Sequence, residues 1–131
     1  MVQERMVKDV SPDEVAAEMS KRKLLFVDCW APWCNPCLAL APILDELDQK
    51  YADNEDVGFL KVNTQIHVQF AIDNNITGIP CVLLYVDGKP AQIEIEAEGN
   101  AEPFTLDRLI GLRPAEHYEF IISKVMGTET D

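Results

Sequence analysis

An apolar run followed at once by two closely spaced cysteines constrains this chain more than any other feature. Residues 24–30 are rich in strand-forming side chains, and an aromatic turn connects them to the C-x-x-C pair Cys34 and Cys37. The next segment, residues 38–51, carries apolar side chains at helical spacing. The order strand, tight turn and helix predicts that the two cysteines lie at the N-terminal end of a helix.

A helix N-terminus is a favourable place for a negatively charged sulfur. Unpaired backbone N–H groups and the positive end of the helix dipole point outward there. We therefore expect the pKa of Cys34 to be lowered, because the thiolate is the charged form of cysteine. Cys37 lies about one turn further along and can reach back to bond to Cys34. The local chemistry indicates a reversible dithiol–disulfide pair.

Two ionisable residues interrupt apolar segments. The run over residues 24–30 is apolar enough for a central strand covered on both faces, so an ionised Asp28 there is costly and its pKa should rise. Lys61 lies in a second apolar strand, residues 57–63. We expect a buried Lys61 opposite Asp28, which would offset both penalties. The alternatives are an Asp28 solvated at the start of the loop and a Lys61 that reaches solvent.

The charge of the chain narrows its partners. The 131 residues carry a formal net charge of -12, and the pI is near 4.4. Such a field repels nucleic acid and anionic membranes.

The N-terminus lacks the apolar core of a signal peptide, and no apolar run is long enough for a membrane span. We expect one cytoplasmic domain over residues 1–126 with a flexible tail over residues 127–131, and cysteines that are catalytic or free rather than structural.

These features together resemble the thioredoxin family. Five stretches match it in type, order and spacing: V-D-x-W-A-x-W-C-x-P-C at residues 27–37, Pro42, K-V-N at residues 61–63, G-I-P at residues 78–80 and D-G-K at residues 87–89. The match covers residues 24–90, with weaker agreement over residues 6–23. The resemblance implies an α/β thioredoxin fold, in which helices flank a central mixed β-sheet.

The resemblance also implies roles for the cysteines and the buried ion pair. It implies that Cys34 is the exposed attacking thiolate and that Cys37 is the buried resolving thiol. Asp28, with Lys61 beside it, matches the buried acid that helps to deprotonate the resolving cysteine. These four residues form the expected catalytic set.

A second set of residues matches the part of the family that binds the substrate. Ile79 and Pro80 match the segment before and at a cis-proline, whose backbone lies against the bound substrate chain. Trp33 matches the aromatic residue that shapes the rim of the site. Gly111 resembles the glycine that ends the last strand, and we expect it beside the substrate.

Two further cysteines lie outside the C-x-x-C pair. By strand alternation Cys29 faces away from Asp28, and we expect it to be a small core residue. Cys81 follows Pro80 directly, close to the expected site. We expect it to be buried filler as well, and the alternative is an accessory redox thiol.

Residues 91–105 interrupt the family pattern. Residues 92–96 read Q-I-E-I-E and alternate as a strand does, and E-G-N at residues 98–100 offers a turn. We therefore expect an inserted acidic hairpin, which grows from the end of the sheet opposite Cys34. Its expected role is a solvated decoration or a contact with partners.

Two alignments of the C-terminal third with the family pattern are possible. In the alignment used above, Gly111 ends the last strand. In the alternative, Gly99 ends that strand and residues 104–110 form a helix. The composition of the segment does not separate the two.

We expect a thiol–disulfide oxidoreductase that reduces protein disulfides without a metal or an organic cofactor. Its partners would be disulfide-containing proteins and a reductase or small dithiol that restores the dithiol, and we expect a monomer. One alternative is a non-catalytic thioredoxin-fold module that binds a partner through residues 91–105. The other is a metal or Fe–S site that Cys34 and Cys37 share across a dimer.

Overall fold

The apolar run before the cysteines forms the central strand of a β-sheet. The computed structural model describes residues 6–96, 99 and 101–127, and in it this run is β2, Leu24–Trp30. Six of its seven residues are buried. The strand β3 (Val57–Asn63) pairs with it in parallel on one side, and β4 (Cys81–Val86) pairs with it antiparallel on the other. The expectation of a central strand is confirmed.

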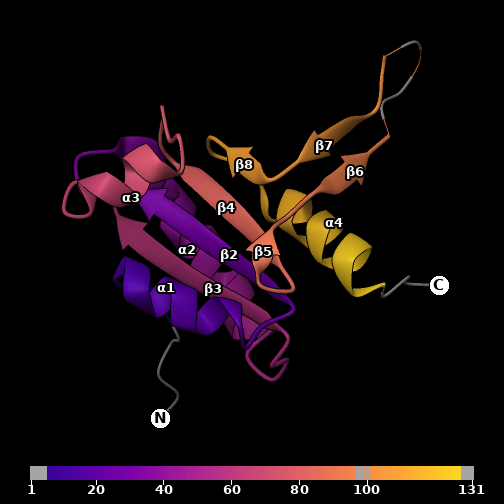
Figure 1. Ribbon diagram of the computed structural model, residues 1–131, viewed down its shortest axis with the longest axis horizontal. Helices are drawn as coiled ribbons and strands as arrows, with labels where there is room; N and C mark the ends of the chain where they lie inside the picture. The colour runs from indigo at the N-terminus through magenta and orange to yellow at the C-terminus, as the bar shows by residue number, and fades with distance from the viewer. Residues whose placement is uncertain (1–5, 97–98, 100, 128–131) are drawn as a thin grey trace.

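Short strands complete this mixed sheet (Figure 1). The two-residue β1, Lys8–Asp9, pairs in parallel with β3. On the far edge of β4, both β5 (Lys89–Pro90) and β8 (Arg108–Ile110) pair antiparallel with it. The order is therefore β1-β3-β2-β4, followed by β5 and β8 along different stretches of β4.

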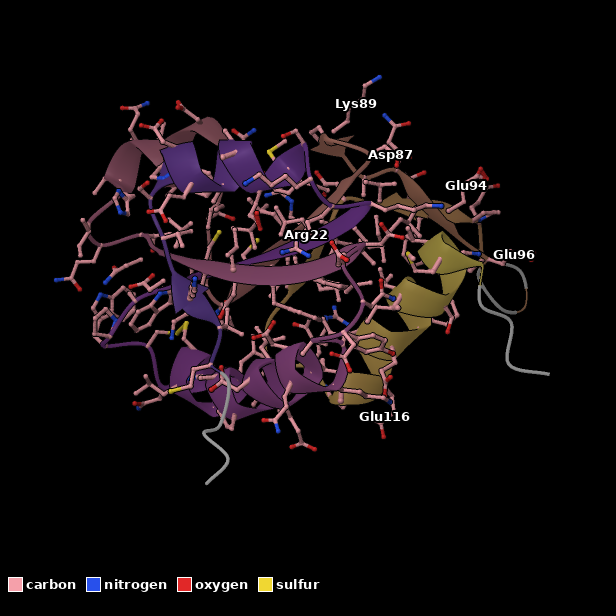
Figure 2. The ribbon with its side chains drawn as sticks, turned by 90° about the horizontal axis from the view of Figure 1, so that it is seen from below. Arg22, Asp87, Lys89, Glu94, Glu96 and Glu116 are labelled. Atoms are coloured by element: carbon pink, nitrogen blue, oxygen red, sulfur yellow. A yellow bond between two sulfur atoms is a disulfide. The ribbon has the colours of Figure 1, made fainter. Side chains whose placement is uncertain are left out.

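Helices cover both faces of the sheet (Figure 2). On one face lie α1 (Pro12–Met19) and α3 (Val68–Asp73), and on the other lie α2 (Asn35–Lys50) and α4 (Ala115–Met126). This arrangement confirms the expected class, a mixed sheet flanked by helices. No helix in the part of the chain that the structure describes is both long and apolar enough to cross a membrane.

The alternation of β2 divides the apolar interior into two cores. Phe26 belongs to the core under α2 and α4, whereas Val27 and Cys29 belong to the core under α1 and α3. Successive side chains of a strand point to opposite faces, so Asp28 shares the face of Phe26. The acid therefore points toward α2, the helix that begins at the cysteines.

Local sequence explains where the helices begin and end. The Ser11 side chain and Glu14 form a capping box at the start of α1. Cys34 is the N-cap of α2, and that helix continues through Pro42 to Lys50. Gly127 ends α4 in the left-handed conformation, at φ +68°. The expected tail after Gly127 lies outside the described residues.

A separate two-stranded ribbon occupies most of residues 91–105 and ends just beyond them, at Leu106. In it, β6 (Ile93–Ile95) pairs antiparallel with β7 (Phe104–Leu106). In Figure 1 the ribbon projects to the upper right, whereas α3 lies at the left of the molecule. Figure 2 places Glu94 and Glu96 on this projecting part. That the segment is an insertion relative to the family stays a prediction, and most of its turn lies outside the described residues.

The alternative alignment of the C-terminal third is wrong. Residues 104–110 form the strands β7 and β8 and not a helix. Gly111 follows β8 directly and adopts φ +85°, a left-handed conformation in which a side chain would be strained. The glycine that ends the last strand of the central sheet is therefore Gly111.

Candidate active site

Four connections meet at one edge of the sheet. The parallel strands β2 and β3 both end there, and β4 runs the opposite way and begins there. Because β8 is antiparallel to β4, it also ends at this edge. The topology thus brings together the loop of Cys34, the segment Ile79–Pro80 and the turn at Gly111.

Cys34 and Cys37 are joined by a disulfide at the start of α2. Cys34 is the N-cap residue, and the backbone N–H of Cys37 donates a hydrogen bond to the Cys34 sulfur at 3.2 Å. This N–H is one of the donors that a helix leaves unpaired at its first turn. The same donor and the helix dipole stabilise negative charge on Cys34 when the pair is reduced.

The expected exposure of Cys34 is wrong for the disulfide form. Its residue is only 4% exposed, and Cys37 is 2% exposed. The Cys34 sulfur is bonded to Cys37 and also lies 3.7 Å from the Ile79 carbonyl oxygen, so little of its surface reaches solvent. The adjacent Trp33, in contrast, is 69% exposed.

The segment before β4 carries a cis peptide bond, as expected, between Ile79 and Pro80. Pro80 is fully buried, and its carbonyl accepts a hydrogen bond from the Gly111 N–H at 2.9 Å. Ile79 is half-buried, and its carbonyl is the group next to the Cys34 sulfur. The backbone carbonyl of Ile79 therefore lies beside the disulfide.

Asp28 is buried in the core beneath α2. It is 3% exposed, and its Oδ1 atom has no hydrogen-bond partner among the described residues. Burial raises the pKa of Asp28 from 3.8 to about 7, against an opposing contribution from Lys61, and Asp9 and Asp45 raise it further. The carboxyl group can therefore take up or release a proton near neutral pH.

Lys61 lies opposite Asp28 in the strand register but does not form the expected buried pair with it. Lys61 is half-buried, and in the described part of the chain no ion pair joins its ammonium group to the Asp28 carboxylate. The Nζ atom lies instead 4.7 Å from the centre of the Trp30 ring. The Trp30 indole N–H donates to Asp9 at 3.1 Å.

The register explains this correction. Asp9 and Asp28 are the two partners of Lys61, one on each side of it. The flexible lysine stem lets the ammonium group rest on the aromatic face near Asp9 and keep part of its hydration. From there it still lowers the pKa of Asp28, but it does not remove the cost of burying that acid.

Exposed apolar side chains lie in the loops that meet at the site edge. Trp33 is 69% exposed, Ile66 after β3 is 70% exposed, and Leu112 after β8 is 51% exposed. Of these three residues, only Trp33 was predicted from the sequence. An apolar residue shortly after a strand end was the signal for the other two, but the sequence alone does not show which strand ends share an edge.

Cys29 and Cys81 are free thiols in the opposite core. They are directly paired in the register of β2 and β4, and they are 0% and 2% exposed. Burial raises the pKa of both thiols. Among the residues that the structure describes, no group of three or more histidine, cysteine or acidic residues is placed to hold a metal ion.

Comparison with known proteins identifies the family. A family model described as Thioredoxin matches residues 6–109. The chain belongs to the thioredoxin family. Thioredoxin 1 of Synechococcus elongatus is 42% identical over 65 residues, which are 50% of this chain and 59% of that thioredoxin, less than two thirds of its length. The thioredoxin of Mycolicibacterium smegmatis is 32% identical over 83 residues, which are 63% of this chain and 74% of that protein.

Solved thioredoxin structures have the same fold. A thioredoxin from Plasmodium falciparum superimposes with a TM-score of 0.68 at 27% identity, over 90% of this chain and 98% of that chain. Chloroplastic thioredoxin z superimposes with a TM-score of 0.72 at 23% identity, over 97% of this chain and 98% of that chain. The thioredoxin relatives and the Cys34–Cys37 disulfide together support a protein thiol–disulfide oxidoreductase.

Proposed function

We propose that this protein reduces disulfides in other proteins through Cys34 and Cys37. The observation that carries the proposal is the Cys34–Cys37 disulfide at the N-cap of α2, where the Cys37 N–H donates to the Cys34 sulfur. Reversible formation of this bond moves two electrons and needs no metal or organic cofactor. The direction is set by the reduction potential of the couple relative to its partners.

The reaction has two exchange steps. The Cys34 thiolate attacks one sulfur of a substrate disulfide, the substrate S–S bond breaks, and the other substrate sulfur leaves as a thiolate. The Cys37 thiolate then attacks the Cys34 sulfur of the mixed disulfide. This closes the Cys34–Cys37 bond and releases the second substrate thiolate, so the substrate gains two electrons and the protein loses two.

The second step requires that Cys37 lose a proton. Asp28 is buried on the face of β2 under α2, and its pKa of about 7 suits a group that accepts this proton. Lys61 acts from a distance, because it favours the ionised form of Asp28 without touching it. We assign Asp28 to the proton step and Lys61 to its electrostatic support.

The substrate chain would lie across the edge where the four connections meet. Trp33 offers an exposed aromatic surface there, and the backbone of Ile79 lies against the Cys34 sulfur. Pro80 and Gly111 support this backbone through the hydrogen bond between them. Cys81 is buried, so we assign it to the core and not to the reaction.

The partners follow from the chemistry. Thioredoxins act on disulfide-containing substrates and are restored by reductases, and we propose both kinds of partner here, with a small dithiol as the alternative donor. The net charge of -12 supports a monomer that binds neither nucleic acid nor anionic membranes. A reducing compartment such as the cytoplasm would keep the pair in its active dithiol form.

The reduction of insulin disulfides by dithiothreitol tests the proposal. Cys34→Ser should reduce the catalysed rate to the background of dithiothreitol alone, because the attacking sulfur is gone. Cys29→Ala, which removes a buried thiol from the opposite core, should retain the wild-type rate. A Cys34→Ser protein that reduces insulin as fast as the wild type would disprove the mechanism.

A further inference from the structure

Two buried polar atoms on the α2 and α4 side of the sheet have no hydrogen-bond partner among the described residues. They are Oδ1 of Asp28 and the hydroxyl oxygen of Tyr118. Asp28 is 3% exposed, and Tyr118 is 0% exposed. A buried polar group without a partner is costly, so two of them in one core call for an explanation.

The fold places Tyr118 over the strand face that carries Asp28. The Tyr118 ring packs edge-on against Phe26, with the ring centroids 5.8 Å apart. Phe26 and Asp28 are two residues apart on β2 and therefore point to the same face. Asp28 pairs with Val82 of β4, and Val82 pairs in turn with Leu109 of β8. Leu109 lies in the same core as Tyr118. The tyrosine and the acid are thus brought to one region of one core by α4 and β2.

The electrostatics agree with this placement. Burial raises the pKa of Tyr118, and the next largest cause is the charge of Asp28. Arg113 lowers this pKa and Cys81 raises it, both by smaller amounts. Tyr118 is therefore a protonated hydroxyl at neutral pH, which is the form that donates a hydrogen bond.

The other charged groups that act on Asp28 already have contacts elsewhere. The Lys61 ammonium lies over the Trp30 ring, and Asp9 accepts the Trp30 indole N–H. Asp45 of α2 accepts a backbone N–H from the N-terminal segment at 2.9 Å. The Tyr118 hydroxyl, by contrast, is a buried donor without a partner among the described residues.

The two groups make no direct hydrogen bond with each other, and we propose that one bridging water accepts a hydrogen bond from the Tyr118 hydroxyl, donates one to the Asp28 carboxyl group, and so positions this group for proton exchange with Cys37. Tyr118 is a positioning residue, because it acts through Asp28 and does not touch the reacting sulfurs. The inference rests on the proposed role of Asp28 in the second exchange step.

This bridge has a measurable consequence. A donor to a carboxylate favours the ionised form, so the water that Tyr118 orients holds the pKa of Asp28 below the value that burial alone would set. Without the hydroxyl, Asp28 keeps its proton to higher pH. The second exchange step should then slow near neutral pH and recover at high pH, where Asp28 is ionised in both proteins.

Tyr118→Phe removes only the hydroxyl, and Tyr85→Phe is its matched control. Tyr85 is a buried tyrosine of the opposite core, and burial raises its pKa to about 12. The rate of mixed-disulfide resolution is measured from pH 5.5 to pH 9, with thermal unfolding to verify the fold of each variant. Tyr118→Phe should move the midpoint up by about half a pH unit and leave the high-pH rate unchanged. Tyr85→Phe should match the wild type.

A Tyr118→Phe midpoint equal to that of the wild type would overturn the inference. If this variant does not fold, the wild-type protein still decides, because the carbon-13 signal of the Tyr118 ring should titrate together with the Asp28 carboxyl signal. A Tyr118 signal that does not move through that titration would also overturn it.

Asp28→Asn distinguishes the role of Tyr118 from the proton role of Asp28. If it abolishes the pH transition of the second step while Tyr118→Phe does not shift it, only the role of Tyr118 is wrong. If Asp28→Asn leaves the transition intact, the proposed proton role of Asp28 is wrong. Neither outcome bears on attack by Cys34, which the insulin assay tests.

Discussion

The chain contains two pairs of cysteines that are equally buried but differ in their bonding and in their surroundings. Cys34 and Cys37 lie at the first turn of α2, joined by a disulfide, with a helix N–H donated to the Cys34 sulfur. Cys29 and Cys81 lie opposite each other in the middle of the sheet as free thiols. The pairs have similar burial, since all four residues are at most 4% exposed.

The comparison shows that the surrounding donors decide the chemistry. Thiolate formation in the first pair is helped by the helix terminus. In the second pair no such terminus is available, and burial among apolar side chains raises the pKa of both thiols. Buried cysteine is therefore a redox centre at one location and a core hydrophobe at the other.

The largest difference between the pairs should appear when the resolving sulfur is removed. Cys37→Ser leaves Cys34 able to attack but unable to release the substrate, so a mixed disulfide should accumulate and insulin reduction should fall to background. Cys81→Ala should form no such adduct. Non-reducing electrophoresis and mass spectrometry of the reaction mixture distinguish the outcomes. A stable adduct on Cys81 in the Cys37→Ser protein would show that Cys81 is an accessory redox thiol.

Alkylation of the reduced protein should rank the thiols. At pH 7 we expect iodoacetamide to modify Cys34 at least about 100-fold faster than Cys29 or Cys81, since only thiolates react and the helix end favours the thiolate. Peptide mapping after timed quenching measures each rate. In denaturant the rates should converge, and similar rates in the native protein would contradict the comparison.

Asp28 lies on the face of β2 that α2 covers, the helix of Cys34 and Cys37, and its burial should lower the stability of the fold. Its folded-state pKa of about 7 is above the ordinary 3.8, so the folded protein binds this proton more tightly. The stability from this group is full below about pH 3.8 and declines as the pH rises toward 7. Asp28→Asn should therefore raise the free energy of unfolding by on the order of 4 kcal/mol at pH 8.

The same substitution should slow the second exchange step, because the proton acceptor is gone. Urea unfolding at pH 4 and pH 8 measures the stability effect, and we expect little gain at pH 4, where Asp28 is protonated. Lys61→Met is a useful contrast, because it keeps the Asp28 carboxyl group and should raise its pKa further. An equal gain for Asp28→Asn at both pH values would contradict the assigned pKa.

The smallest expected effects concern stability of the cysteine sites themselves. Serine is a good N-cap, so under reducing conditions Cys34→Ser should differ from the dithiol wild type by less than about 0.5 kcal/mol in the free energy of unfolding, while it abolishes activity. Cys29→Ser places a hydroxyl in an apolar core and should cost about 1–2 kcal/mol while activity is retained. Chemical denaturation and the insulin assay are run on both variants. Loss of activity in Cys29→Ser with retained activity in Cys34→Ser would contradict the comparison.

The local sequence predicted most of the site. The run before the cysteines is apolar on both faces, which placed β2 in the centre of the sheet and made Asp28 a buried acid. Cys34 and Cys37 at a strand-to-helix turn were identifiable because caps and helix starts depend on residues close in the chain. The raised pKa of Asp28 was also predictable, since burial is its largest cause.

The contacts between distant segments required the tertiary structure. The sequence suggested a direct Asp28–Lys61 pair, but the register places Lys61 between two acids and beside Trp30, and its ammonium group rests on that ring. The strand order also brings Ile66 and Leu112 to the site edge. Neither relation is visible in local composition, because register and strand order are set by packing of the whole sheet.

The sequence by itself thus determined which cysteines react, because helix-end chemistry is local. It did not determine what surrounds Asp28. Tyr118 lies on α4, ninety residues further along the chain, and it shares a core with the acid only because α4 packs on the same sheet face as Phe26. The tertiary structure decided the proton environment of the site, since a pKa depends on every group packed around a residue, whatever its distance in sequence.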